Sequence, residues 1–526
     1  MKDGSYMSYS CLNNPRRWIG PLLRFSKDPF ILGCFLFIIV KIVYFYLGFH
    51  RDLYVQSYEC LARMWHSYTF KSFQVFYADN PWLPLHPILL SLVLLPHISS
   101  WFVGSLFQTV ISILGGIFCA LLAREIYHRD WHAGVAALAA WLGSTTLIII
   151  GLGYLSEPLF HLEIMATLYF GIRWMREGNR KWRVWTLISI FSMQLTRYEG
   201  WTLTAVYLLF WLVLLLDSRL RKLWRDYQGL WNWSVRDILL MVVFVSIIPL
   251  CWMGLNHALY GNPLYFIWLT EDSFHQNMQS SFPHLITLYL NYLQGAFASQ
   301  PFVVILGLFI FFMPSLLYSP AFMILVTICV LILSNFQCIM KGATAFSYPE
   351  RLSVTLFVPF CVLFGLTCAH LSALLGKAGK RLKGVSYLLF LLLILLPVIM
   401  GFNGFRGRVS VLQLKFNKAV LDTLKAELGK SPGEPKPRVL FEHTKGNYST
   451  ILFFVDMDSS EYVPFLRKKD PKGDSRNELI AQYPSIRYLI LNHNQENVRW
   501  VKKLKNCHLL AIGTMWDLYE YRRPAP

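Results

Sequence analysis

The chain has 526 residues, of which 55% are hydrophobic and only 15% are charged, and its formal net charge is +19. About 25% of the residues of a soluble domain are charged, so this composition excludes an ordinary soluble protein and predicts a polytopic α-helical membrane protein. The basic residues cluster in short loops between apolar runs, which is typical of cytoplasmic loops and argues against nucleic acid as a partner.

Apolar runs predict the membrane spans, each of which needs about 20 residues. The predicted spans are 29–49, 102–123, 132–150, 158–174, 184–195, 200–216, 238–255, 301–318, 319–337, 352–374 and 384–402. Basic residues precede the first run with no small-residue cleavage site after it, so we expect that run to be retained. The segment 84–97 is also apolar, but it is short and contains three prolines.

The charge of the loops sets the sidedness of these spans. The loops 124–131, 173–183, 217–237 and 376–383 are rich in Lys and Arg and should be cytoplasmic. All four can be so only if 84–97 does not cross the membrane. The prediction is therefore a cytoplasmic segment 1–28 and a transmembrane domain 29–402 of about 11 spans plus one interfacial or re-entrant helix.

The segment 50–83 lies on the outer side and is rich in tyrosine, tryptophan and phenylalanine. It is too polar to cross a membrane, and aromatic side chains with one polar edge suit the headgroup layer. Asp52 lies at its beginning, at the membrane–water boundary. Such a carboxylate either marks the end of a span or takes the proton from an acceptor hydroxyl. Asp52 is thus the candidate catalytic base.

Two further acidic positions and two histidines are candidates on the outer side. Glu157 begins a span, either as a second catalytic acid or as a first-turn residue that complements the helix dipole. His161 is one turn later on the same helix face, where the two side chains would orient a substrate or hold a metal ion. Asp79 and His86 flank a proline-rich turn and either bind sugar hydroxyls or simply belong to the start of the short helix.

Two arginines are candidates for phosphate recognition, because the planar guanidinium matches phosphate oxygens. Arg197 and Arg351 each lie at the predicted outer end of a span. The alternative role is an internal ion pair, of Arg197 with Glu199 or Glu157 and of Arg351 with Glu350. Glu199 is itself a candidate substrate-binding residue.

Residues 403–526 differ in composition, with more charge and short alternating runs. A helix is predicted at 410–429, strands at 437–442, 486–492 and 508–512, and further helices near 477–483 and 495–504. This pattern predicts a small C-terminal α/β domain, which eleven spans place on the extracytoplasmic side. It has no glycine-rich phosphate loop, and the chain has no CxxC or Cys/His metal spacing, so neither a cofactor nor a metal site is assigned.

Several short motifs follow one another along the chain. They are the acid after the first span at Asp52, a proline-rich turn at 81–87, SEPLF at 156–160, LTRYEG at 195–200 and ERLxxxLxxP at 350–359. Their order and spacing resemble the GT-C superfamily of integral membrane glycosyltransferases, in particular its bacterial protein-mannosyltransferase-like and GPI-mannosyltransferase-II-like branches. The resemblance extends over residues 28–402.

The resemblance implies a GT-C-like fold and inverting transfer of a sugar, from a polyprenyl-phosphate-linked donor to a lipid, glycan or protein acceptor, on the extracytoplasmic face. It implies the role of base for Asp52 and of second outer-loop acid for Glu157. Many members have a paired acid where this chain has Asp52-Leu53, so no cofactor is assigned and a divalent cation is left open. The expected location is a bacterial inner membrane, or the endoplasmic reticulum membrane of a eukaryote.

Two other functions are alternatives. A transporter or flippase of lipid-linked sugars would favour paired repeats and broken helices in both halves, whereas the sequence has one candidate interruption and no internal repeat. A non-catalytic membrane scaffold leaves unexplained why Asp52, Glu157, Arg197 and Arg351 are all predicted on one side.

Overall fold

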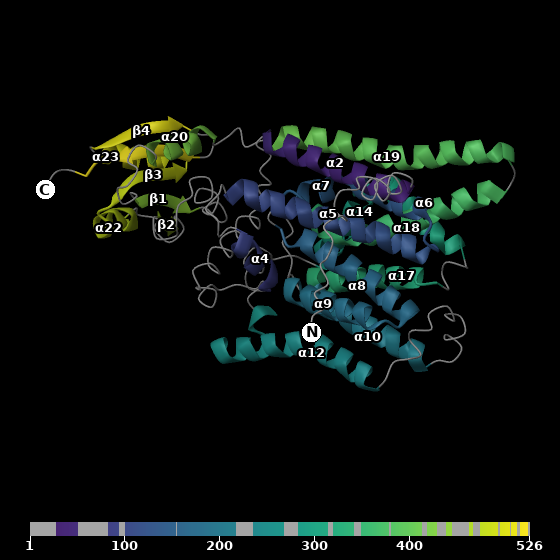
Figure 1. The fold of residues 1–526 in the computed structure, drawn as a ribbon. Coiled ribbons are helices and arrows are strands. Elements are labelled where there is room, and N and C mark those ends of the chain that lie inside the picture. The colour runs from purple at the N-terminus through teal and green to yellow at the C-terminus, as the bar shows by residue number, and fades with distance from the viewer. Residues whose placement is uncertain are drawn as a thin grey trace, which may run out of the picture.

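The fold is seen in a computed structural model of the chain (Figure 1). The residues that it describes are 28–50, 83–93, 100–153, 155–216, 235–267, 282–313, 319–340, 349–377, 380–412, 418–428, 438–443, 462–466, 474–492, 495–504, 506–512 and 516–523. The predicted site residues Asp52 and Asp79 lie outside these ranges, and only the backbone of Arg351 is described.

Helices form nearly all of the described chain up to residue 428. They are α2 (Pro29–His50), α4 (Leu85–Val93), α5 (Ser100–Ile126), α6 (Trp131–Gly143), α7 (Thr145–Ile150), α8 (Glu157–Glu177), α9 (Arg180–Thr196), α10 (Glu199–Leu216), α12 (Val235–Tyr260), α14 (Phe282–Ser299), α15 (Pro301–Leu308), the 3-10 helix η4 (Phe309–Phe312), α17 (Ala321–Met340), α18 (Pro349–Lys377), α19 (Lys380–Leu412) and α20 (Lys418–Leu428).

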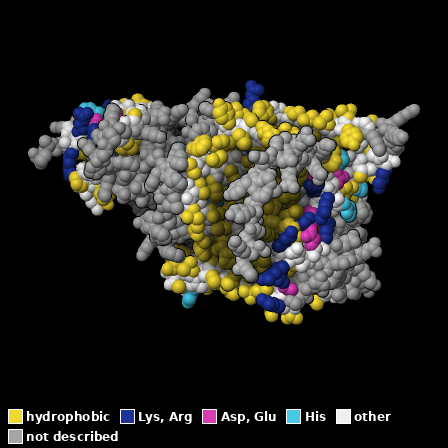
Figure 2. All heavy atoms as spheres, viewed as in Figure 1, with side chains coloured by type: hydrophobic (Ala, Val, Ile, Leu, Met, Phe, Trp, Pro, Cys, Tyr) yellow, Lys and Arg dark blue, Asp and Glu magenta, His cyan; other side chains and the backbone are white. Residues whose placement is uncertain are grey.

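Six of the described helices are long and apolar enough to cross a membrane. These stretches are Pro29–Gly48, Phe102–Ile126, Glu199–Leu216, Val235–Tyr260, Ser353–Lys377 and Gly384–Arg406. A bent pair, Tyr289–Phe297 with Pro301–Phe312, would make a seventh span. Large hydrophobic side chains are exposed on α2, α12 and α19, and Figure 2 shows hydrophobic side chains over the middle of the bundle. The prediction of a multi-pass helical membrane protein is confirmed at this level.

The predicted number of eleven spans is not confirmed, because some predicted spans are interrupted or short. The apolar run 132–150 is divided between α6 and α7. At the division Ser144 is extended, and its hydroxyl accepts a hydrogen bond from the backbone N–H of Leu147, which caps a second helix. The short helix α4 has nine residues. It is about 13 Å long, against a hydrocarbon core of about 30 Å, and because 94–97 lie outside the described residues the interfacial or re-entrant character of 84–97 stays a prediction.

The sequence predicts a polar loop on the outer side at 256–300, between two predicted spans, whereas most of the described residues of this segment form helices. The helix α12 continues to Tyr260, and α14 occupies the last part of the segment. Tyr292 and Ala296 of α14 are buried, and the helix packs against α17 and α18. The prediction was wrong because polar residues are interspersed among the apolar residues of α14. A search for continuous apolar runs misses such an amphipathic helix.

The core of the bundle forms where α18 packs against α5, α6, α14 and α15. In the apolar window of α18, 89% of the residues are buried. Glycines permit close contact at two crossings. A Cβ at Gly365 of α18 would collide with the carbonyl oxygen of Ala133 in α6, and a Cβ at Gly115 of α5 would lie 3.6 Å from Cα of Leu162 in α8. The helix α8, which carries the candidate site residues Glu157 and His161, therefore lies beside α5.

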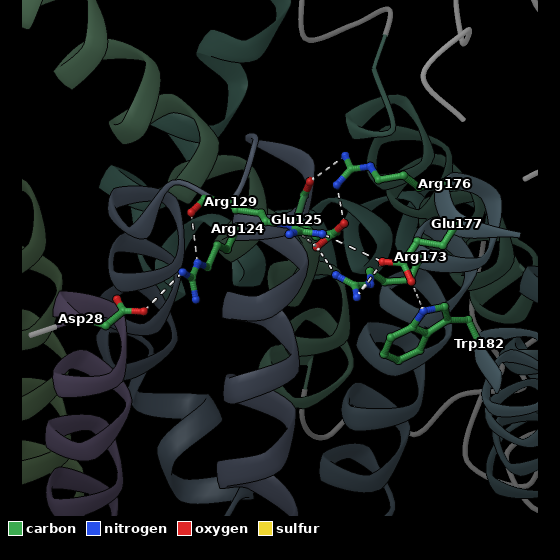
Figure 3. A network of polar contacts seen from close by, with 8 residues as sticks. All are labelled: Asp28, Arg124, Glu125, Arg129, Arg173, Arg176, Glu177 and Trp182. Atoms are coloured by element: carbon green, nitrogen blue, oxygen red, sulfur yellow. Dashed lines mark hydrogen bonds and ion pairs between the residues drawn. The ribbon is translucent and has the colours of Figure 1, made fainter. Parts of the chain in front are cut away.

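A network of ion pairs joins α5 to α8 at one end of the bundle (Figure 3). The Glu125 carboxylate accepts a hydrogen bond from Nη1 of Arg173 at 3.1 Å and another from Arg176. Arg173 also lies 2.7 Å from the carboxylate of Glu177. Because the Glu125 side chain is only 5% exposed, these arginines supply the positive charge that a buried carboxylate requires.

Other contacts bring further predicted cytoplasmic segments to the same end. Nη2 of Arg124, next to Glu125, lies 3.4 Å from the Asp28 carboxylate before α2 (Figure 3). The hydroxyl of Tyr127 lies 3.4 Å from Nδ1 of His370 near the end of α18. Lys and Arg side chains are visible toward this end of the bundle in Figure 2. The described residues of the basic segments 124–131 and 173–183 thus lie at one end of the bundle, with the start of α2 and the last part of α18, as their charge pattern predicts.

The chain ends in a five-stranded sheet in the order β2-β1-β3-β5-β4, which lies beyond one end of the bundle in Figure 1. Its elements are β1 (Arg438–His443), β2 (Tyr462–Leu466), α22 (Asp474–Gln482), β3 (Ile486–Asn492), α23 (Gln495–Lys503), β4 (Cys507–Ile512) and β5 (Trp516–Tyr521). The strands β2, β1 and β3 are parallel, and β5 is antiparallel to both β3 and β4. The strands predicted at 437–442, 486–492 and 508–512 agree with β1, β3 and β4 to within one residue, whereas β2 and β5 were not predicted.

Candidate active site

The candidate site is built from the first residues of α8 and α10 and the last turn of α9. Glu157 is the first residue of α8, and Pro158 follows it, a position where the missing N–H of proline is tolerated. Arg197 ends α9 with an extended backbone at φ −149° and ψ 148°. The chain turns there, and α10 begins two residues later at Glu199. Residues from two separate motifs, SEPLF and LTRYEG, thus come together.

Arg197 lies between two carboxylates. Its Nη1 donates to Oε1 of Glu157 at 2.8 Å. Its Nη2 and Nε donate to the two carboxylate oxygens of Glu199 at 2.6 and 3.2 Å. The side chains of Glu157, Arg197 and Glu199 are 1%, 13% and 15% exposed. We call these three residues the Glu-Arg-Glu cluster.

The cluster brings one basic and two acidic side chains together. All three guanidinium nitrogens of Arg197 are engaged by carboxylates, and a phosphate would have to compete with them. The two carboxylates are acceptors whose positions are fixed by the fork of the arginine. Such groups suit the binding of hydroxyl donors, as a sugar or an alcohol acceptor would present.

His161 lies on the next turn of α8 and points to another helix. Its Nε2 is 3.0 Å from the hydroxyl of Thr355 in α18, and its ring meets the edge of Trp141 with centroids 6.3 Å apart. It therefore joins α8 to the helix that carries Arg351 in its first turn. Among the described residues there is no group of three or more His, Cys, Asp and Glu side chains suited to a metal ion, so the described part of the site does not define one.

His86 is buried near the start of α4 and contacts α5. Its Nε2 lies 2.6 Å from the side-chain amide nitrogen of Gln108. Because that nitrogen is a donor, the ring Nε2 accepts and the ring proton is assigned to Nδ1. The contact fixes the short helix to the span beside α8. His86 is therefore held against α5.

Sequence reasoning missed two buried charged residues. Lys41 of α2 is fully buried, and its Nζ donates to the hydroxyl of Ser112 in α5 at 2.9 Å. A Cβ at Gly151 would lie 2.6 Å from that hydroxyl, so the lysine lies close to the link between α7 and α8. Glu163 of α8 is 4% exposed and faces α9. A single charged residue within an apolar run is the sequence signal for both.

Comparison with solved structures identifies the fold. The chain is similar to the crystal structure of ArnT from Cupriavidus metallidurans bound to undecaprenyl phosphate, with a TM-score of 0.58, 13% identity, and coverage of 92% of this chain and 97% of that chain. The apo structure of the same ArnT gives a TM-score of 0.56 at 12% identity, with coverage of 92% and 97%. At this identity the likeness establishes the fold alone.

A weaker likeness is to an oligosaccharyltransferase from Archaeoglobus fulgidus tethered to an acceptor peptide. Its TM-score is 0.47 at 11% identity, with 94% of this chain and 74% of that chain covered. No protein-family model and no curated protein sequence matches the chain. The chain thus has a fold similar to that of these ArnT structures, and the mannosyltransferase-like branch stays a prediction.

Proposed function

We propose that the protein is a membrane glycosyltransferase that transfers a sugar from a polyprenyl-phosphate-linked donor to a hydroxyl of an acceptor. The observation that carries the proposal is the buried Glu-Arg-Glu cluster, built from two separate motifs in a bundle with the fold of ArnT. The solved ArnT structure holds undecaprenyl phosphate, which is the chemistry of the proposed donor carrier. A multi-pass protein suits this substrate because a prenyl chain cannot leave the bilayer.

The proposed reaction inverts the anomeric centre. Asp52 takes the proton of the acceptor hydroxyl as the oxygen attacks the anomeric carbon. The bond between that carbon and the phosphate oxygen breaks, and the polyprenyl phosphate leaves as an anion. A phosphate is a good leaving group, so a cation can replace a general acid, and we assign this role to Arg351. Asp79 and His86 complete the substrate-binding residues predicted from the sequence.

Within this reaction the Glu-Arg-Glu cluster binds and orients the hydroxyls of the sugar. Glu157 is 0% exposed and is held by Arg197, so its position is fixed before any substrate arrives. Its carboxylate and that of Glu199 accept hydrogen bonds from sugar hydroxyls, and His161 stabilises the start of α8 against α18. Preorganised groups of this kind raise the rate by holding the reactants in the attacking geometry.

The reaction is proposed to take place on the extracytoplasmic face, with the domain 403–526 on the same side. The basic loops that gather around Glu125 are then cytoplasmic, and Glu157 and Arg197 lie at the opposite ends of α8 and α9. A bacterial inner membrane is the proposed location, with the endoplasmic reticulum membrane as the eukaryotic equivalent. The acceptor is a lipid, a glycan or a protein.

The test is transfer by the purified protein in nanodiscs, with a panel of radiolabelled undecaprenyl- and dolichyl-phosphate sugars and membrane extract as acceptor. We expect transfer from at least one donor, and a loss of about 100-fold or more in kcat for Asp52→Asn and Glu157→Gln. Glu177→Gln, at the opposite end of α8, is the matched control and should retain activity. Wild-type turnover in Asp52→Asn would remove that residue as the base.

The same preparation separates transfer from transport. Vesicles loaded with a fluorescent polyprenyl-phosphate sugar report movement between leaflets without any covalent product. Rapid movement with no transferred sugar for any donor would favour a flippase and contradict the proposal.

A further inference from the structure

Glu163 is a buried acid that the proposed reaction does not use. It lies on α8, six residues after Glu157, and its Oε1 accepts hydrogen bonds from two hydroxyls of α9. Oγ1 of Thr196 is 2.9 Å away and also lies 3.0 Å from the Ser192 carbonyl oxygen, and the other donor is Oγ of Ser192. The two donors are four residues apart, so they lie on the same face of α9, one turn apart at the end of the helix.

An acid at this position is costly. Glu163 is 4% exposed, and among the described residues no Lys, Arg or His lies within ion-pair distance of it. Transfer of a carboxyl group from water to an apolar interior costs free energy even when it is hydrogen-bonded, and the charged form costs more. An apolar side chain would fill this place between two helices at lower cost. The hydrogen bonds to α9 are therefore the feature that needs an explanation.

Those hydrogen bonds fix the residue that comes just before Arg197. Thr196 is the last residue of α9, and the chain becomes extended at the next position. From the other side, Nε2 of Gln194 donates to the hydroxyl of Thr204 at 2.9 Å, and Nε1 of Trp201 donates to the Gln194 carbonyl at 2.9 Å. The link between α9 and α10 is thus held by α8 on one side and α10 on the other.

We propose that Glu163 is a positioning residue that holds the end of α9 against α8, so that the guanidinium of Arg197 meets the carboxylate of Glu157. The inference rests on the proposed function, because it assigns Glu163 a role through the Glu-Arg-Glu cluster. Two contacts then join α8 to the end of α9. One is the ion pair between Arg197 and Glu157, and the other is the pair of hydrogen bonds to Glu163, less than two turns later on α8. Loss of the hydrogen bonds to Glu163 leaves the guanidinium of Arg197 free to shift relative to Glu157.

The first experiment compares Glu163→Gln with Glu163→Leu. A carboxamide oxygen accepts from both hydroxyls, whereas leucine accepts from neither. We expect kcat for transfer from a polyprenyl-phosphate sugar to fall by about 100-fold in Glu163→Leu, the effect of a displacement of about 1 Å, with a smaller change in KM for the donor. The kcat of Glu163→Gln should stay within about threefold of the wild-type value, because glutamine keeps both hydrogen bonds and Arg197 is not displaced.

A double-mutant cycle separates positioning from a general loss of stability. In the Glu157→Gln background the ion pair with Arg197 is already weakened, so Glu163→Leu should then reduce the residual kcat only slightly. A purely structural role would reduce kcat by the same factor in both backgrounds. Thr186→Val is the control, because Thr186 is buried on α9 but its hydroxyl donates to the Trp182 carbonyl of its own helix. It should leave kcat unchanged.

Hydrogen exchange of the segment 193–201 provides a readout that does not depend on activity. We expect faster exchange of this segment in Glu163→Leu and in Thr196→Val, but not in Glu163→Gln. Unchanged exchange in both variants would overturn the inference even if no donor were identified. Wild-type kcat in a folded Glu163→Leu protein would overturn it while the proposed function stood. Absence of transfer by the wild type would count against the proposed function alone, and exchange would then decide the role of Glu163.

Discussion

Arg197 donates to Glu157 and Glu199 with all three of its side-chain nitrogens, and the carboxylates come from different helices. A buried charge is tolerated when opposite charges and hydrogen bonds compensate its desolvation. The arginine therefore has a structural task, to hold the ends of α8, α9 and α10 together, in addition to any role in binding. Phosphate recognition, the role that the sequence favoured for it, stays a prediction.

Replacement of Arg197 by alanine should strongly destabilise the bundle. The change leaves two buried carboxylates without their common partner, and breaking a buried ion pair in this way costs about 3–5 kcal/mol. We expect a marked decrease in the melting temperature of the detergent-solubilised protein, followed by tryptophan fluorescence. Arg197→Lys should have an intermediate effect, because a single ammonium cannot reproduce the fork.

Arg183→Ala is the control for this prediction. Arg183 pairs with Asp237 between α9 and α12 and is 26% exposed. Because Arg183 is more exposed than Arg197 and solvent screens it more, its loss should cost less than that of Arg197. Equal melting temperatures of Arg197→Ala and the wild type would show that the Glu-Arg-Glu cluster does not stabilise the protein.

Glu520 of β5 offers a pH-dependent contact in the sheet. Burial alone raises the pKa of its carboxyl, but hydrogen bonds from Arg522 and Arg487, together with their charges, outweigh burial and hold the pKa below the usual 4.5. Nη2 of Arg487 and Nη2 of Arg522 lie 3.1 Å from its two oxygens. A lowered folded-state pKa means that the contact stabilises the sheet above about pH 4.5 and is lost as the pH falls through the folded-state value.

The measurement is the difference in melting temperature between the wild type and Glu520→Gln from pH 7 to pH 3. We expect the wild type to be more stable at neutral pH, with a constant difference down to about pH 5 that declines at lower pH. Glu478→Gln, an exposed acid of α22, is the control and should show no such decline. A difference that grew toward acid would contradict the assignment.

The residues of the site were predictable to different degrees. Glu157, Arg197 and Glu199 were found because ionisable residues at the ends of apolar runs are conspicuous, and Glu199 had been considered as a partner of Arg197. An ion pair of Arg197 with Glu199 or with Glu157 is an alternative that the sequence leaves open, and the structure shows that Arg197 contacts both carboxylates. Lys41 and Glu163 lie within helices, where only the tertiary contacts with Ser112 and Thr196 reveal their environment.

At the level of elements, glycines set the distance between α19 and the short helices α6 and α7. A Cβ at Gly401 would collide with the carbonyl oxygen of Leu142, and a Cβ at Gly404 would collide with the hydroxyl of Thr145. The helix backbones therefore approach closely. Oγ1 of Thr145 also donates weakly to the Gly401 carbonyl at 3.4 Å. Small residues permit such crossings in membrane bundles, where lipid is as apolar as the helix surface.

Gly401→Val should push α19 away from α6. We expect a loss of about 1–3 kcal/mol in the free energy of unfolding, the usual cost of overpacking a close contact. Gly384→Ala on the same helix is the matched control, because no atom lies within 4 Å of a Cβ there. The control should be neutral or stabilising by up to about 1 kcal/mol, since alanine favours helix over glycine. Equal stability of both variants would contradict the crossing.

The predicted elements agree with the structure where one signal dominates. Continuous apolar runs gave α2, α5 and α12, because a single physical requirement, burial in lipid, determines their composition. The signal failed for α14, whose buried face is interspersed with polar residues. It also failed to show that the predicted boundary at 403 falls within α19, which is continuous to Leu412. The domain division therefore stays a prediction.

For the whole molecule, the gathering of basic loops at one end defines two opposite ends of the bundle. The helix α19 starts at Lys380, next to the basic end of α18, and carries the chain to the other end before the sheet (Figure 1). Loops rich in Lys and Arg are retained in the cytoplasm. The sheet of residues 438–521 is then expected on the opposite side of the membrane.

Reporter fusions test this orientation. Alkaline phosphatase, which is active only outside the cytoplasm, should be active when fused after residue 526 and inactive when fused after residue 178, between α8 and α9. A cytoplasmic fluorescent protein at the same two positions should give the reverse pattern. Activity of phosphatase at residue 178 would place the basic loops outside and would invert the proposed topology.

The length of α19 has a mechanical consequence. The helix has 33 residues and so measures about 50 Å, whereas the hydrocarbon layer is about 30 Å thick. An upright α19 thus extends beyond the hydrocarbon layer by about 20 Å in total. Because Gly401 contacts α6 well before the helix ends at Leu412, a small tilt about this contact displaces the end of α19 sideways.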